Sequence, residues 1–153
     1  MKNNKLKLLW ILACGSSVTD QQSNSLSLFN VIEQVTVNVD PQKKDSFPSK
    51  EGIVVPFPFE IVTLLSKSTE EYDKDYFFSA KVSSIDPNGK ITGEIPFETK
   101  IDKDKKRIRL NIKTDGIKVT IEGGYLFRLS VKAKGEKEYV DLGELPMEVM
   151  IKI

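Results

Sequence analysis

The chain has 153 residues and a formal net charge of +1, from 23 basic and 22 acidic side chains. This balance provides no long-range field that would select nucleic acid, an anionic membrane or an acidic substrate, and we expect no nucleic-acid partner. The chain has no histidine and one cysteine, which excludes an internal disulfide, a four-ligand Cys/His zinc site and a nucleophile–histidine pair.

The first fourteen residues allow two interpretations. Lysines at positions 2, 5 and 7 precede an apolar run over residues 8–13, which ends at Cys14. We favour a buried first strand over residues 1–14, with Cys14 as a core thiol, in a cytoplasmic domain that spans residues 1–153. The alternative is a lipoprotein-type signal that ends before Cys14, with a lipid on Cys14 and a membrane-anchored domain. The apolar run is too short to span a bilayer, which needs about 20 residues.

A family resemblance supports the strand interpretation. It rests on the run LLWILAC at residues 8–14, a polar turn with Asp20, and the run SLFNVIE at residues 27–33. Over residues 6–37 this pattern resembles a family of uncharacterised small bacterial β-sandwich proteins, a domain of unknown function. The resemblance implies a cytoplasmic β-sandwich and transfers no catalytic residue.

The stretch from Leu26 to Val39 is rich in β-branched and aromatic residues, which favours a strand. We predict one long central strand here, with a bulge near Ile32–Glu33. A polar loop follows over residues 40–52. In Val54–Phe59, prolines two residues apart remove backbone donors from one edge, which predicts an edge strand or a corner between sheets.

The second half of the chain shows repeated period-2 alternation. It predicts strands over residues 76–83, 107–113, 125–133 and 145–153, and an edge strand with Pro96 over residues 90–99. Asp86–Gly89 and Asp115–Gly116 are predicted turns, and Tyr125 after two glycines is typical of the tyrosine corner of a sandwich. With about eight to ten strands, we predict an all-β fold: a single antiparallel β-sandwich, immunoglobulin-like in the broad sense.

No motif points to catalysis, to a cofactor or to a metal. Asp86, Asn88, Asp102 and Asp104 offer oxygen ligands for calcium, but they fit turns better than a calcium loop. The one local concentration of charge is basic: Lys103, Lys105, Lys106, Arg107 and Arg109. Such a run can contact phosphates, but the interleaved aspartates favour a solvated hairpin.

We therefore expect a non-enzymatic binding or adaptor module that acts through exposed loops or a sheet edge. We expect a protein partner, no cofactor, no metal and no catalytic residue, and a membrane association only if Cys14 is lipidated. The alternative is an exported lipoprotein whose sandwich domain binds carbohydrate or an envelope component. An enzyme that uses carboxylates or a Ser–Lys pair is the third and least favoured hypothesis.

Overall fold

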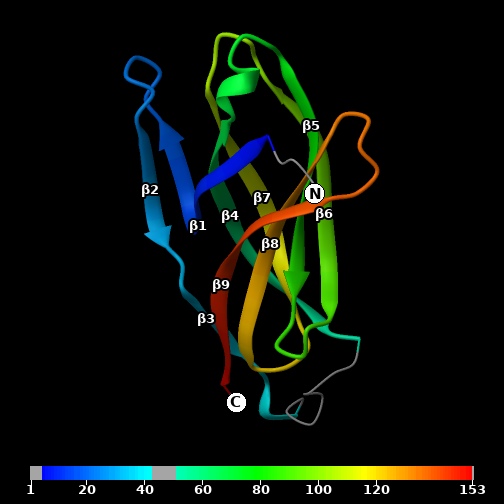
Figure 1. The fold of residues 1–153 in the computed structure, drawn as a ribbon. Helices are drawn as coiled ribbons and strands as arrows, with labels where there is room; N and C mark the ends of the chain where they lie inside the picture. Colours follow the sequence, from blue (N-terminus) through cyan, green and yellow to red (C-terminus); the bar gives the residue numbers. More distant parts are fainter. Residues whose placement is uncertain (1–4, 43–50, 153) are drawn as a thin grey trace.

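A computed structural model describes residues 5–42 and 51–152. Predictions that fall on residues 1–4, on residues 43–50 of the polar loop and on Ile153 lie outside the described residues. The described chain forms nine strands and a short 3-10 turn, arranged as a two-layered sandwich (Figure 1). The strands are β1 (Leu6–Thr19), β2 (Leu26–Val31), β3 (Gln34–Asn38), β4 (Ile53–Lys67), β5 (Tyr76–Ile85), β6 (Ile91–Ile101), β7 (Arg107–Val119), β8 (Gly123–Ala133) and β9 (Val140–Lys152), and the turn is η2 (Thr69–Glu71).

The strands form two sheets, with the orders β2-β1-β4-β7 and β3-β9-β8-β5-β6. All pairs are antiparallel except β3–β9, which is parallel. The predicted all-β, immunoglobulin-like sandwich is thus confirmed, with one parallel pair that the sequence did not predict. No helix among the described residues is long and apolar enough to cross a membrane.

The core lies between the two sheets and follows the predicted alternation. On β5, Phe78, Ala80 and Val82 are buried, and on β8 Tyr125 and Leu129 are fully buried. These strands bury every second side chain because successive side chains point to opposite faces of a sheet. Both inner faces contribute to one continuous apolar cluster.

The prediction of one long central strand over residues 26–39 is wrong. The stretch divides into β2 and β3, which lie in different sheets, and each is an edge strand. The change of sheet occurs over two residues. Ile32 donates its N–H to the carbonyl of Ala13 on β1, and the carbonyl of the following residue, Glu33, accepts from the N–H of Glu148 on β9. Asn30, the last residue but one of β2, has a positive φ of 56°, which interrupts the extended backbone just before this switch.

The prediction of an edge at the prolines is confirmed only for the segment of β4 that contains Pro56 and Pro58. β4 is a central strand, but β1 pairs only with its residues 60–67, so the proline segment has one partner strand. Pro96 lies on edge strand β6, as predicted. The predicted turn at Asp115–Gly116 is wrong, because β7 runs through it. A Cβ at Gly116 would lie 2.6 Å from the carbonyl oxygen of Val55, so the glycine permits a close approach of β7 to β4.

The N-terminal segment forms strand β1, which extends five residues beyond Cys14. Its first half pairs with β4 and its second half with β2. Leu6, Ala13 and Cys14 are buried. The segment therefore supplies both a ladder and core side chains to the sandwich.

Tyr125 forms the predicted tyrosine corner. Its hydroxyl accepts a hydrogen bond from the N–H of Thr120 (2.9 Å) and donates one to the carbonyl of Ile121 (2.8 Å). Thr120 Oγ1 in turn donates to Asp86 Oδ2 (2.7 Å). The other oxygen of Asp86 accepts from the N–H groups of Asn88 and Lys90, so this carboxylate serves the turn between β5 and β6, as its sequence context predicted.

Candidate functional site

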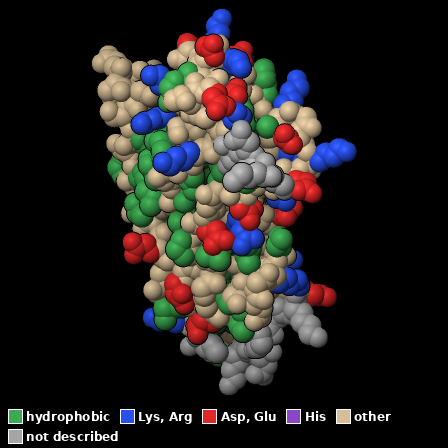
Figure 2. Space-filling model, in the orientation of Figure 1, with side chains coloured by type: hydrophobic (Ala, Val, Ile, Leu, Met, Phe, Trp, Pro, Cys, Tyr) green, Lys and Arg blue, Asp and Glu red, His purple; other side chains and the backbone are tan. Residues whose placement is uncertain are grey.

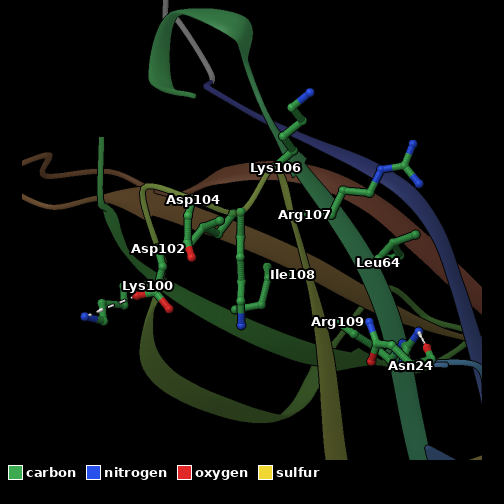
Figure 3. Close-up of a pocket in the computed structure, with 11 residues that line it drawn as sticks. Asn24, Leu64, Lys100, Asp102, Asp104, Lys106, Arg107, Ile108 and Arg109 are labelled. Carbon is green, nitrogen blue, oxygen red and sulfur yellow. Dashed lines mark hydrogen bonds and ion pairs between the residues drawn. The ribbon is translucent and has the colours of Figure 1, made fainter. Parts of the chain in front are cut away.

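A groove of about 840 Å³ opens where β6 passes into β7 at one end of the sandwich (Figure 3). It brings together the end of β6, the connection over residues 102–106, the start of β7, one residue of β4 and the turn between β1 and β2. We call it the basic groove. Its lining consists of Asn24, Leu64, Lys100, Ile101, Asp102, Asp104, Lys105, Lys106, Arg107, Ile108 and Arg109.

The basic groove carries five basic and two acidic side chains, whereas the whole chain has a net charge of only +1. Lys100 pairs with Asp102 at 3.3 Å. Within the described part of the chain, Lys105 and Arg107 form no ion pair. The groove is therefore a local positive site on a nearly neutral protein, and it favours an anionic ligand.

Arg109 is the basic side chain that the fold holds in place. One terminal nitrogen donates to Thr19 Oγ1 (3.5 Å) and the other to the carbonyl of Asn24 (3.3 Å), both from the hairpin of β1 and β2. Its Nε is buried and has no hydrogen-bond partner in the described structure. Both acceptors are neutral, so neither balances the positive charge of the guanidinium.

The hairpin turn over Arg109 is ordered by hydrogen bonds from its backbone N–H groups to the side chain of Asp20. Asp20 Oδ1 accepts from the N–H groups of Gln22 (2.8 Å) and Ser23 (3.0 Å). The N–H of Ser23 and then that of Gln22 lower the pKa of Asp20. The structure thus keeps the Asn24 carbonyl at a fixed place beside Arg109.

A buried lysine fixes the other side of the basic groove. Lys67 is only 2% exposed, and its Nζ donates to the carbonyls of Lys74 (2.8 Å) and Asp102 (2.9 Å). The N–H of Lys103 donates to Asp75 Oδ1 (2.7 Å). The 102–106 connection is therefore tied to the loop before β5, and its charged side chains project from a constrained backbone.

Of the predicted basic run, Lys105, Lys106, Arg107 and Arg109 line the groove, while Lys103 does not. The structure adds Asn24, Leu64 and Lys100, which sequence reasoning missed. Asn24 and Leu64 lie far from the run in sequence and carry no motif, so only the fold brings them to it, whereas Lys100 lies just before the run. Within residues 5–42 and 51–152, no three His, Cys, Asp or Glu side chains gather in a way that could hold a metal ion.

A second hollow, an apolar crevice of about 280 Å³, opens between β6 and the far end of β7. Phe59 and Phe127, whose ring centroids are 5.8 Å apart, and Ile117 contribute to its lining. At the lining's surface, Val54 is 68% exposed and Ile95 is 40% exposed. The two sheets therefore leave their core accessible along the side where β6 and β7 are the edge strands.

A third surface presents exposed apolar side chains. Val18, Phe29 and Val31 are each at least half exposed on β1 and β2. Figure 2 shows hydrophobic side chains gathered on the side of the molecule where these strands lie. No charged residue lies within β2. Nothing in the described structure indicates what would cover this surface.

Cys14 is fully buried, and its Sγ lies 3.9 Å from Glu60 Oε2. Burial raises the pKa of this thiol, and the negative charge of Glu60 raises it further. Both effects favour the unreactive thiol over the nucleophilic thiolate.

Comparison with known proteins leaves the family undetermined. No family model matches the chain, and no curated protein matches it. One similar solved structure is the CooA pilin subunit from enterotoxigenic Escherichia coli, with 12% sequence identity and a TM-score of 0.35, over 98% of this chain and 100% of that chain. At so low a TM-score we base no argument on this likeness, and the resemblance noted over residues 6–37 stays a prediction.

Proposed function

We propose that this protein is a non-enzymatic binding module for another protein, and that the basic groove receives an acidic segment of that partner. One observation carries the proposal: Arg109 is held in the groove by two neutral oxygens, while its Nε is buried without an acceptor. A buried donor without a partner costs about 1–3 kcal/mol, so a carboxylate that draws the guanidinium out of the groove wall and accepts from Nε would remove that cost.

The chemistry of the groove favours a carboxylate. An arginine guanidinium pairs with a carboxylate through two parallel hydrogen bonds, which gives both strength and a fixed orientation. The fold already orients Arg109, so little side-chain entropy is lost when the pair forms. Arg107 and Lys105 lie beside it without an ion pair in the described structure and are available for further acidic groups.

The same groove is poorly suited to nucleic acid. Asp102 and Asp104 belong to its lining and would repel a continuous phosphate backbone. The lining contains no aromatic side chain on which a base could stack. A short acidic segment of a protein, whose charges are spaced along a flexible chain, fits the mixed lining better.

We further propose that the domain is cytoplasmic and that residues 6–14 remain part of it. Removal of the chain before Cys14 would take away Leu6 and Ala13, both core residues, and the segment of β1 that pairs with β4. The alternative, an exported lipoprotein anchored at Cys14, is tested by the intact mass of the native protein in soluble and membrane fractions. A membrane-bound species that begins at a lipid-modified Cys14 would refute our proposal.

The binding proposal is tested with a fluorescent glutamate-rich peptide of about eight residues. We expect saturable binding that weakens with added salt, because screening of exposed charges strengthens with ionic strength. Reversal of Lys105 and Arg107 to Glu should raise the Kd by about tenfold or more.

The matched control reverses Lys137 and Lys152 to Glu. These two lysines are exposed, make the same change in net charge and lie outside the groove. If the two double variants lose affinity equally, the peptide senses only the total charge and the groove is not the site. A third variant, Arg109→Lys, keeps the charge but removes the Nε donor, and we expect it to bind more weakly than the wild type.

A further inference from the structure

The free edge of β7 connects the two hollows on this side of the molecule. β7 pairs with β4 along one edge, and within residues 5–42 and 51–152 no strand pairs with its other edge. β6 is the nearest edge strand of the other sheet and forms no ladder with β7. The basic groove borders β7 at residues 107–109, and the apolar crevice borders it at residues 114–118.

The side chains of β7 alternate in character over residues 107–113. Ile108, Leu110 and Ile112 belong to the core or pack against it. Arg107 and Lys113 are exposed, and Arg109 is half-buried on the same face. A strand placed beside residues 107–113 would therefore meet the cations Arg107 and Lys113 on one face and the apolar interior on the other, because directly opposite residues share a face. The Arg109 guanidinium is directed over β4 to the β1–β2 hairpin, away from this edge.

We propose that the partner segment binds as an added strand along the free edge of β7, and that it alternates acidic and apolar residues. This inference rests on the proposed function and specifies its ligand. Backbone N–H and C=O groups of β7 would supply the ladder. Acidic side chains would face Arg107 and Lys113, while the intervening apolar side chains would close the open side of the sandwich.

Charge selects this occupant over a second copy of the chain. Two β7 edges paired with each other would bring arginines and lysines of one copy close to those of the other, and like charges that face each other across a ladder are destabilising. An acidic strand reverses the sign of the same contacts. The edge is therefore protected against self-association while it remains open to an acidic partner.

The geometry sets the length of the segment. The alternation covers residues 107–113 of β7, which rise about 20 Å at about 3.3 Å per residue. Burial then changes phase, because Lys113 and Asp115 are exposed whereas Ile117 is buried. An alternating segment of about seven residues would therefore cover this stretch of β7, beginning beside the basic groove.

The test compares two fluorescent peptides of identical composition and length. In one, glutamate and valine alternate, and in the other the glutamates and valines form two separate blocks. Strand addition predicts that the alternating peptide binds about tenfold or more tightly than the block peptide. Lys113→Glu should weaken the alternating peptide and leave the block peptide unchanged, because Lys113 lies on β7 outside the groove. Lys137→Glu is the matched control.

A second measurement examines the ladder directly. N-methylation of the alternating peptide, one residue at a time, should abolish binding at every second position and have little effect between, because alternate N–H groups of a strand point toward its neighbour. Equal binding of both peptides, with loss only in the Lys105/Arg107 variant, would overturn strand addition and leave the groove proposal standing. Absence of any effect of the Lys105/Arg107 variant would overturn both.

Discussion

The tyrosine corner gives the sharpest test of the fold, through the substitution Tyr125→Phe. This change removes one oxygen and leaves a fully buried ring in place. It leaves two backbone groups without this hydrogen-bond partner: the N–H of Thr120, a residue that is only 4% exposed, and the carbonyl of Ile121. A buried unsatisfied group costs about 1–3 kcal/mol, and Ile121 is partly accessible to water, so we expect a loss of about 2 kcal/mol in the free energy of unfolding.

Urea denaturation measures this loss. With an m-value of about 2 kcal/mol per molar urea, the midpoint should fall by about 1 M, and the Tm by about 4–8 °C. Tyr139→Phe is the matched control, because the Tyr139 hydroxyl makes no hydrogen bond to the described residues. Its ring lies under Lys81 and Lys132, and phenylalanine retains that contact. Equal midpoints for the two variants would refute the role assigned to the Tyr125 hydroxyl.

Three further predictions concern single side chains. Burial acts to raise the pKa of Asp86, but hydrogen bonds from Thr120, Lys90 and Asn88 outweigh it and lower the pKa below its ordinary value. The contribution of Asp86 to stability is therefore present above the ordinary pKa and is lost as the pH falls through the lowered one. Asp86→Asn should flatten the acid limb of a stability–pH curve, and an unchanged limb would contradict this. Cys14 should react with iodoacetamide only after unfolding in urea, because its thiol is buried and its pKa is raised; rapid modification of the folded protein would show that β1 opens. Lys67→Met should speed hydrogen exchange in residues 102–106 by about tenfold or more, since two carbonyls lose their charged donor, while exchange in β8 serves as the internal reference.

The sequence predicted those parts of the fold in which local pattern and tertiary environment agree. The alternation around Phe78, Tyr125 and Ile112 identified half-buried strands because each of them has one face on the core. Residues 26–39 were mispredicted because both β2 and β3 have strand-forming sequences, and nothing local indicates that they join different sheets. The switch depends on the backbone partners of Ile32 and Glu33, which lie on β1 and β9.

The candidate site was predictable only in part, for a similar reason. The basic run was visible in the sequence, and a solvated hairpin was the favoured interpretation. What distinguishes the groove from a solvated hairpin is the hairpin of β1 and β2, which lies over Arg109 from about 85 residues away in sequence. Such a contact depends on the packing of whole elements, which periodicity does not encode.

The structure also separates two roles that lysines and arginines have at a sheet edge. Charges that only discourage aggregation need exposure and nothing more, and Lys113 is of this kind until a partner is present. Arg109 is different, because two hydrogen bonds orient its side chain and its Nε is buried without an acceptor in the described structure. An arrangement that holds a cation in place and leaves one of its donors unsatisfied gains nothing as protection against aggregation. It gains stability only when an acceptor arrives, and this asymmetry is why we assign recognition to the groove and not to the remaining charged edges.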